Sequence, residues 1–384
     1  MIDEFNFPLK MNSFRIACLG GGYDSAIGRV HHSAMGLDGC FAVVAGCFST
    51  DPDQNRVSAE MFGVSPDRVY HDLEDMIKHE LGRIDAVVVL TPTDQHSDQV
   101  AKLLKAGVPV ICEKALAGNS ADIQSLKSLC SSTNGFLSVT YNYLGFPMVR
   151  EIKMMIESGR LGRLCHINLQ MPQEGFIRLN QATNLKFTPQ PWRLVDHFVP
   201  TISLDLGVHL HSLVSYLTGL KPKDVVAVSA KQGNFSLITD YVSAIANYTD
   251  DVICNFCYGK TSLGQRNGLK LQIFGQLGSV EWVQEDSERL RVSDQYGNVS
   301  IVDRGTQSLM IANAKRYERF KPGHPSGFIE AFANYYFDTY FQLLAYREGR
   351  KIPKNGCDID VALEGLLFLE AVERSCRSKS WVTM

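Results

Sequence analysis

"FRIACLGGGYDSAIGRVHH", residues 14–32, joins a short apolar run to three consecutive glycines and then to a helix-like segment. A glycine-rich turn between a strand and a helix places backbone N–H groups at a helix N-terminus, where they bind a pyrophosphate. Gly20 and Gly22 suit the tight turn and the close approach, and Gly28 suits the packing of the helix on the strand. The usual spacing has two residues before the last glycine, whereas residues 23–27 separate Gly22 from Gly28. The stretch therefore predicts a dinucleotide turn that is three residues longer than usual.

The residues beyond this turn alternate between strand-like and helix-like patterns up to residue 145. The strand-like runs are short and almost entirely apolar, and they cover residues 41–49, 84–92, 108–114 and 136–142. Such runs between helices are typical of a parallel sheet with helices on both faces, and ligands of these sheets bind at the carboxyl ends of the strands. We therefore predict an α/β Rossmann domain over residues 14–145, after an N-terminal arm over residues 1–13.

The pattern changes after residue 145. A helix is followed by strand-like runs, several joined by short turns, at 164–171, 224–230, 240–248, 251–258, 269–275, 278–284, 288–293 and 298–303. Short turns between successive strands predict antiparallel pairing. We expect an α+β domain with a large, mostly antiparallel open sheet over residues 146–356. A C-terminal helix and tail over residues 357–384 are expected to pack back on the body.

The composition excludes several classes of function. The 384 residues carry a net charge of -3, so nothing predicts nucleic-acid binding, which needs a basic surface. No apolar run reaches the ~18 residues of a membrane span, and residues 1–13 lack the basic start of a signal peptide. Cys254 and Cys257, the one close cysteine pair, fall on opposite faces of a predicted strand, which does not suit zinc. We expect a cytoplasmic protein with reduced thiols and no metal site.

The tip of the second predicted strand bears on the choice of cofactor. An acidic residue there usually binds the adenosine ribose hydroxyls, whereas a nearby arginine favours the 2′-phosphate of NADP. Ser49 and Thr50 occupy this tip, and Asp51 comes two residues late, where it suits the N-cap of the next helix. Neither signature is complete. We predict NAD as the cofactor, with NADP as the alternative.

Five segments carry a resemblance to a known family. "GRVHHSA", "VVLTPTDQHSDQVAKLLKAGVPVICEKALA", "TYNYLGFPMVREI", "LDLGVH" and "GHPSGFIEAFANYY" occur in the order found in the Gfo/Idh/MocA family of nicotinamide-dependent oxidoreductases. That family includes glucose-fructose oxidoreductases and inositol dehydrogenases. The long loop "GGGYDSAIG" resembles the subgroup that includes levoglucosan dehydrogenase. The resemblance implies that the open sheet forms the interface of a homodimer or homotetramer.

The resemblance also implies where the chemistry takes place. The family's Glu-Lys-Pro motif matches Glu113 and Lys114, and its D-x-x-x-H pair matches Asp205 and His209. Oxidation of a secondary alcohol requires removal of the hydroxyl proton as hydride leaves the same carbon, and a buried lysine can take that proton. A histidine can share it because its unperturbed pKa lies near neutrality. We therefore predict Lys114 as the acid/base, assisted by His209 and Asp205.

One residue of this motif departs from the family pattern. Ala115 follows Lys114 where the family usually has proline. That proline shapes the backbone beside the nicotinamide, and proline bonds are sometimes cis in such turns. We expect alanine to loosen how Lys114 is held.

Further contacts are predicted around these residues. Arginine presents a fork of donors that suits sugar hydroxyls, carboxylates or phosphates. The alternative to substrate binding is a structural role for the aromatic residue at 143, and a place in a surface loop for residues 192 and 193. Cofactor contacts are predicted at Gly20, Gly22, Tyr23, Gly28, Ser49, Thr50, Thr91, Pro92, His96 and Glu113, and substrate contacts at Tyr143, Trp192, Arg193 and His324.

These features predict an enzyme that transfers a hydride between the hydroxyl-bearing carbon of a sugar, sugar derivative or cyclitol and a nicotinamide cofactor. One alternative on the same fold is a redox-neutral, NAD-dependent glycoside-processing enzyme, which lends a hydride and takes it back. Another is a non-catalytic cofactor-binding sensor or regulator. A regulator is expected to lack the lysine or the histidine, and both are present.

Overall fold

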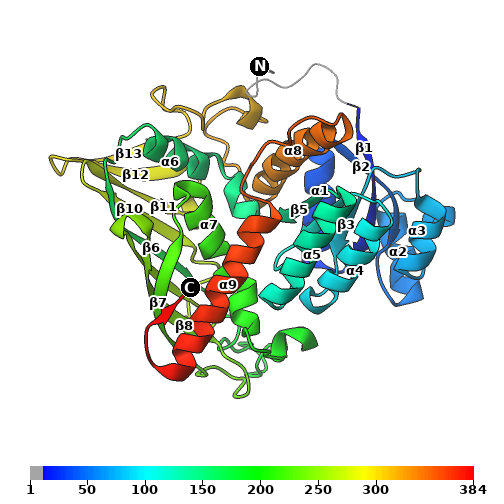
Figure 1. Ribbon diagram of the computed structural model, residues 1–384, viewed down its shortest axis with the longest axis horizontal. Coiled ribbons are helices and arrows are strands. Elements are labelled where there is room, and N and C mark those ends of the chain that lie inside the picture. Colours follow the sequence, from blue (N-terminus) through cyan, green and yellow to red (C-terminus); the bar gives the residue numbers. More distant parts are fainter. Residues whose placement is uncertain (1–11) are drawn as a thin grey trace. The chain divides into compact units, whose positions relative to one another are not determined.

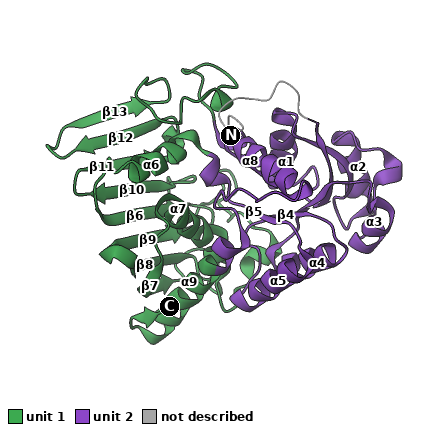
Figure 2. Cartoon of the chain, turned by 45° about the horizontal axis from the view of Figure 1, so that its top comes forward, with its two compact units in different colours: residues 1–6, 146–326, 364–384 green, residues 7–145, 327–363 purple. Residues whose placement is uncertain are grey.

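A computed structural model of the chain describes residues 12–384, which divide into two compact units (Figure 2). Unit 1 contains residues 146–326 and 364–384, and unit 2 contains the described residues up to 145 together with residues 327–363. The arm predicted over residues 1–13 falls mainly on residues 1–11, which lie outside the described residues.

Unit 2 is built on a parallel five-stranded sheet (Figure 1). Its strand order is β2-β1-β3-β4-β5, and every pair of neighbours is parallel. This order confirms the predicted Rossmann domain, and it brings the carboxyl ends of β1, β3 and β4 to one edge of the sheet. The strands are β1 (Phe14–Gly20), β2 (Phe41–Cys47), β3 (Ala86–Leu90), β4 (Val110–Glu113) and β5 (Leu137–Thr140).

Helices cover both faces of this sheet, which explains why β3 and β4 are buried at every residue. Helices α1 (Ala26–Leu37) and α8 (Phe328–Arg347) lie together on one face, and α4 (Thr93–Lys105) and α5 (Ser120–Thr133) lie on the other (Figure 1). Helices α2 (Pro52–Met61) and α3 (Leu73–Glu80) follow β2.

Helix α8 groups with unit 2, although the sequence led us to expect it within the second domain. Its ring-bearing residues account for this placement. The ring of Phe332 lies 4.8 Å from that of His31 on α1, and Tyr336 packs against Phe41 of β2 at 5.4 Å. A helix that is apolar on most sides needs burial on most sides, and unit 2 supplies it.

Unit 1 is built on a nine-stranded sheet of order β13-β12-β11-β10-β6-β9-β8-β7-β14. Strands β6 and β9 pair in parallel and the other neighbours are antiparallel, which confirms the predicted mostly antiparallel sheet. The strands are β6 (Leu164–Pro172), β7 (Pro222–Ala230), β8 (Tyr241–Tyr248), β9 (Ile253–Gly259), β10 (Lys270–Gly275), β11 (Gly278–Val283), β12 (Arg289–Asp294), β13 (Val299–Asp303) and β14 (Val382–Thr383).

One face of this sheet is covered and the other is open. Helices α6 (Pro147–Glu157), α7 (Val208–Thr218) and α9 (Ile359–Ser378) pack on the covered face, α9 with its residues from 364 onward (Figure 1). Burial alternates along β8, where Val242, Ala244 and Ala246 are buried and the residues between them are more exposed. This period of two is what an antiparallel sheet with one open face requires.

Candidate functional site

The predicted nucleotide turn forms at the end of β1. Gly20 and Gly21 adopt φ angles of +77° and +70°, in the left-handed region that favours glycine. A Cβ added to Gly28 would lie 2.0 Å from the carbonyl oxygen of Gly21, so α1 approaches the turn as closely as backbone allows. A Cβ on Gly20 would lie 2.9 Å from Cγ2 of Thr91, at the tip of β3. The glycines therefore keep open a cradle that side chains would fill, which fits a dinucleotide pyrophosphate.

The extra residues of this turn cap helix α1. Ser25 is the N-cap residue: its Oγ accepts from the backbone N–H of Gly28 at 3.3 Å, and its own N–H donates to the carbonyl of Gly22 at 2.8 Å. The N–H of Tyr23 donates to Oγ of Ser58, on α2, at 2.9 Å. The insertion thus folds back as a turn against α2 and moves the helix start to Ala26. The first turn of α1 holds no acidic residue, so its dipole favours an incoming anion.

The tip of β2 offers hydroxyl groups. Asp51 caps α2, because its Oδ1 accepts from the N–H of Gln54 at 2.8 Å, which confirms the predicted cap. Oγ of Ser49 accepts from the N–H of Asp51 at 3.1 Å. Contacts of Ser49 and Thr50 with a cofactor stay a prediction.

The predicted acid/base lysine directly follows β4. Glu113 is the last residue of that strand, and its Oε2 accepts from the backbone N–H of Lys114 at 3.2 Å. Oε1 of Glu113 accepts from Nε2 of His31 at 2.9 Å. The bond between Lys114 and Ala115 is cis. The family motif is thus tied to helix α1, which begins at the glycine turn.

His96, near the start of α4, lies between two strand ends. Its ring is 1% exposed, with Nδ1 2.8 Å from the carbonyl oxygen of Ala115 and Nε2 2.7 Å from that of Thr91. Burial lowers the pKa of His96, and the two carbonyl contacts oppose that shift in part. The imidazole therefore links the ends of β3 and β4. Direct contacts of His96, Thr91 or the α4 N-cap residue Pro92 with a cofactor stay predictions.

In unit 1, Asp205 lies in a π-helical turn (Ser203–Gly207) directly before α7. Such turns are frequent at functional sites. Oδ2 of Asp205 accepts from Nη1 of Arg193 and from Nζ of Lys260, each at 2.5 Å. The Arg193 guanidinium also lies 4.3 Å from the ring centre of Trp192. The structure thus brings Asp205 together with Arg193 and Trp192, a pair that the sequence singled out in a different segment.

Lys260 is the member of this cluster that the sequence did not predict. It directly follows β9, is 8% exposed, and lies with Nζ 5.1 Å from the ring centre of Phe176. Its backbone N–H donates to the carbonyl of Asp240 at 2.8 Å. The local signal that could have pointed to Lys260 is its position at the end of a strand with alternating burial. Its pairing with Asp205 joins residues 55 positions apart, so it leaves no pattern that can be recognised along the sequence.

The other predicted residues are distributed over both units. His209 is 5% exposed and lies in the first turn of α7 in unit 1. Tyr143, in unit 2, is buried, and its ring centre lies 6.2 Å from that of Phe328. This packing contact is what a structural role for Tyr143, the alternative to substrate binding, would produce. His324 is exposed and its ring meets Phe320 edge-on at 4.4 Å. The catalytic and substrate-binding roles of these residues stay predictions.

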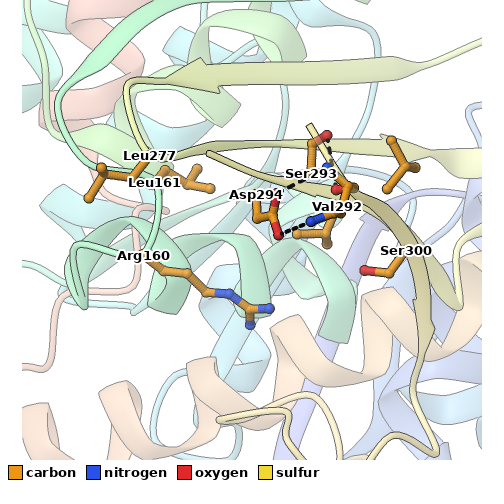
Figure 3. Close-up of a pocket in the computed structure, with 9 residues that line it drawn as sticks. Arg160, Leu161, Leu277, Val292, Ser293, Asp294 and Ser300 are labelled. Carbon is orange, nitrogen blue, oxygen red and sulfur yellow. Dashed lines mark hydrogen bonds between the residues drawn. The ribbon is translucent and has the colours of Figure 1, made fainter. Parts of the chain in front are cut away.

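Unit 1 also contains a cavity of about 360 Å³ beside the β12–β13 hairpin (Figure 3). Asp294, which lines it, accepts from the backbone N–H groups of Tyr296 and Asn298 at 2.9 and 3.0 Å. These bonds close the hairpin turn. The side-chain amide of Asn298, which donates to Asp294 at 3.0 Å, and then the backbone bonds hold the pKa of Asp294 below its usual value. Leu161, Leu277 and Val292 supply apolar walls. Because the carboxylate of Asp294 is engaged in the hairpin turn, this cavity is not a candidate for the active site.

Among residues 12–384, no group of three or more histidine, cysteine, aspartate or glutamate side chains is arranged to hold a metal ion. Over the same residues, no helix has the length and hydropathy needed to cross a membrane.

Comparison with known proteins bears on both units. Residues 14–141 match the oxidoreductase family with an NAD-binding Rossmann fold, and residues 149–281 match the GFO/IDH/MocA C-terminal domain. The chain is 29% identical to the uncharacterized oxidoreductase YfiI of Bacillus subtilis over 383 residues, which cover 96% of each protein. It is 24% identical to an inositol 2-dehydrogenase of Rhizobium meliloti over 378 residues, 96% of this chain and 99% of that one.

Solved structures share the whole fold. An inositol dehydrogenase homolog from Azotobacter vinelandii, complexed with NADH and myo-inositol, is 26% identical with a TM-score of 0.87, over 97% of this chain and 98% of that one. Levoglucosan dehydrogenase in complex with NADH and levoglucosan has a TM-score of 0.82 at 19% identity, over 97% and 99%. At that identity the likeness shows the fold alone, so the resemblance to the levoglucosan subgroup stays a prediction.

Proposed function

This chain belongs to the Gfo/Idh/MocA family of NAD-binding oxidoreductases, and from that premise we propose that it oxidises a sugar, sugar derivative or cyclitol at a hydroxyl-bearing carbon. The observation that carries the proposal is the position of Lys114. It follows β4 at the same carboxyl edge of the sheet where the glycine turn follows β1. Relatives named as inositol dehydrogenases support the cyclitol class.

Each proposed residue has one task in this reaction. Nζ of Lys114 takes the hydroxyl proton, and His209 shares it. The bound NAD supplies the chemistry of hydride acceptance at the same carbon. Asp205 and Arg193 bind substrate hydroxyl groups, since a carboxylate accepts from them and a guanidinium donates to them.

A substrate panel tests the proposal. Sugars, sugar phosphates, nucleotide sugars and inositols are offered with NAD, and absorbance of reduced nicotinamide is followed. We expect turnover with at least one class, and a fall in kcat of about 10²-fold or more in Lys114→Ala with little change in NAD affinity. Lys127→Ala is the matched control, because Lys127 pairs with Asp360 at 2.7 Å on the surface of the same unit. Full turnover by Lys114→Ala would show that the lysine is not the acid/base.

Fluorescence titration with both nucleotides tests the choice of cofactor. We propose NAD, which the matched NAD-binding family supports. The hydroxyls of Ser49 and Thr50 at the β2 tip leave NADP as the alternative. Tighter binding of NADP than of NAD would reverse the assignment.

We further propose a homodimer or homotetramer that forms through the open face of the nine-stranded sheet. Ile245 and Ile253 are 45% and 44% exposed on neighbouring strands, and Asn255 donates to Asn168 at 2.8 Å beside them. Light scattering after gel filtration should give a mass of two or four chains, and a monomer at micromolar concentration would contradict this.

We also propose a cytoplasmic location, because all ten cysteines, which lie within residues 12–384, are free thiols. Recovery of the native protein from the extracellular fraction would contradict it.

A further inference from the structure

Two buried histidines contact the segment 113–115 from its two ends. His31 lies on α1 and is 0% exposed, and His96 lies on α4 and is 1% exposed. His31 contacts the side chain of Glu113, and His96 contacts the carbonyl oxygen of Ala115. Lys114 therefore lies between two residues that are each bonded to an imidazole, and all five residues belong to unit 2.

The contact of His31 is part of a set of three hydrogen bonds that converge on the carboxylate of Glu113. The carboxylate of Glu113 accepts, so Nε2 of His31 carries the proton and donates across 2.9 Å. Nδ1 then has a lone pair and accepts from the phenol of Tyr336. Burial holds the pKa of Tyr336 well above its usual value, which keeps that phenol a donor. The second oxygen of Glu113 accepts from the backbone N–H of Lys114 at 3.2 Å.

The contact of His96 uses the other ring nitrogen. Nδ1 lies 2.8 Å from the carbonyl of Ala115, and Nε2 lies 2.7 Å from the carbonyl of Thr91. A carbonyl oxygen only accepts, and a neutral imidazole carries one N–H, so the ring donates to one of these two carbonyls; it donates to Ala115 in the tautomer with the proton on Nδ1. This bond restrains the peptide that follows Ala115, and alanine has no ring to restrict its own φ.

We propose that His31 and His96 are positioning residues that hold Lys114 from both sides, through the Glu113 side chain and the Ala115 carbonyl. The lysine side chain has a flexible four-carbon stem, so the place of its amine depends on a fixed backbone. A displacement of about 1 Å at a reacting group can cost about 10²-fold in rate. The inference rests on the proposed function, because it assigns the histidines to the lysine that the proposal makes the acid/base.

The two histidines use opposite ring nitrogens, which permits a crossed test. The amide nitrogen of asparagine takes the place of Nδ1, and that of glutamine takes the place of Nε2. His31→Gln therefore keeps the bond to Glu113 and His31→Asn loses it. At position 96 the order reverses, since His96→Asn keeps the bond to Ala115 and His96→Gln loses it.

We expect kcat to follow this crossed order. His31→Gln should exceed His31→Asn, and His96→Asn should exceed His96→Gln, each by about tenfold or more. The Kd for NAD and the Tm should differ little within each pair. His32 supplies the matched control on the same helix, where its ring stacks on Phe62 at 4.3 Å. His32→Asn and His32→Gln should show no crossed order.

A different order would overturn the inference. If the same amide is preferred at both positions, or if kcat falls together with Tm or NAD affinity, the histidines support the fold or the cofactor rather than Lys114. Should a histidine variant fail to fold, Tyr336→Phe provides a milder change, because it removes only the hydroxyl that donates to His31. We expect it to lower kcat severalfold without changing the NAD Kd, and an unchanged kcat would contradict the His31 arm.

A measurement without turnover separates failure of the inference from failure of the proposed function. Lysines are methylated reductively with ¹³C-formaldehyde, and the NMR signal of Lys114 is assigned by its loss in Lys114→Ala. The signal should shift in His31→Asn and His96→Gln and should stay nearer to the native position in the other two variants. This holds even if no tested substrate is oxidised. Signals that are unchanged in all four variants would overturn the positioning role and leave the proposed function standing.

Discussion

Nζ of Lys260 donates to Oδ2 of Asp205 across 2.5 Å, and Arg193 donates to the same oxygen at 2.5 Å. Two cations thus share one carboxylate oxygen within unit 1. Charge-assisted bonds of this kind are about twice as strong as neutral ones, so they restrain the carboxylate in its π-helical turn. The cluster joins the end of β9 to the segment that leads into α7.

Lys260→Met removes one of these two donors and keeps most of the side-chain volume. We expect the KM for substrate to rise or kcat to fall by about tenfold or more, because Asp205 then loses one of the two charged donors to this oxygen. The NAD Kd should stay nearly constant. Lys231→Met is the control, since Lys231 is an exposed lysine whose Nζ donates to the carbonyl of Leu237. Equal steady-state constants in the Lys260 variant and the native enzyme would exclude Lys260 from the substrate site.

Gly28→Ala tests the glycine turn. The new Cβ would lie 2.0 Å from the carbonyl oxygen of Gly21, so α1 has to move away from the turn. We expect the NAD affinity to fall by about tenfold or more and the Tm to drop, measured by titration and thermal melting. Gly36→Ala in the same helix is the control, because a Cβ there meets no atom within 4 Å and alanine favours the helix by up to about 1 kcal/mol. NAD binding as tight as in the native protein would argue against a pyrophosphate at this turn.

Glu151→Gln tests how the segment 304–326 is held. The fully buried carboxylate of Glu151 accepts from three successive backbone N–H groups, those of Met310, Ile311 and Ala312. An amide has one acceptor oxygen and presents its N–H₂ to the remaining donors, so we expect a loss of about 2–3 kcal/mol in unfolding free energy. Amide hydrogen exchange at residues 310–312 should rise, and Glu285→Gln at an exposed turn should change neither quantity. Protection equal to that of the native chain would show that other contacts hold the segment.

Acid should weaken the fold through Glu80. Its carboxylate is fully buried, and it accepts from Nε of Arg68 at 2.9 Å and from the phenol of Tyr70 at 2.7 Å. Burial alone would raise the pKa of Glu80, but the bonds from Arg68 and Tyr70 outweigh it, and the net pKa lies below the usual 4.5. The folded state therefore keeps this group ionised to lower pH than the unfolded chain does. Its stabilisation is complete above pH 4.5 and is lost as the pH falls through the folded-state pKa.

Glu80→Gln tests this linkage. We expect the variant to lose about 3 kcal/mol of unfolding free energy at pH 7, because it leaves the partly buried Arg68 guanidinium without its partner charge. The gap to the native protein should narrow below pH 4.5. Urea unfolding at a series of pH values measures both, and a gap that is independent of pH would contradict the assignment.

Local signals predicted most of the fold. The apolar runs became β1 to β5, the alternating runs became β6 to β13, and Asp51 caps α2 as its position before Pro52 indicated. These features depend on periodicity and on residues close in sequence, so they can be read along the chain. The family motifs likewise pointed to Lys114 and Asp205, because each motif consists of residues that are close together in the sequence.

Other features escaped sequence analysis because they join distant residues. Lys260 reaches Asp205, and Tyr336 reaches His31 across 305 residues. Helix α8 joined unit 2 because its rings pack on α1 and β2, which no local pattern specifies.

The sequence by itself determined the order of the elements, the two sheets and the glycine turn, because backbone preference and hydrophobic periodicity are local properties of the chain. Only the tertiary structure decided which side chains hold Glu113, Ala115 and Asp205. Those contacts arise when segments 19 to 305 residues apart are packed together, and buried polar groups must then find partners among the groups that this packing brings within reach.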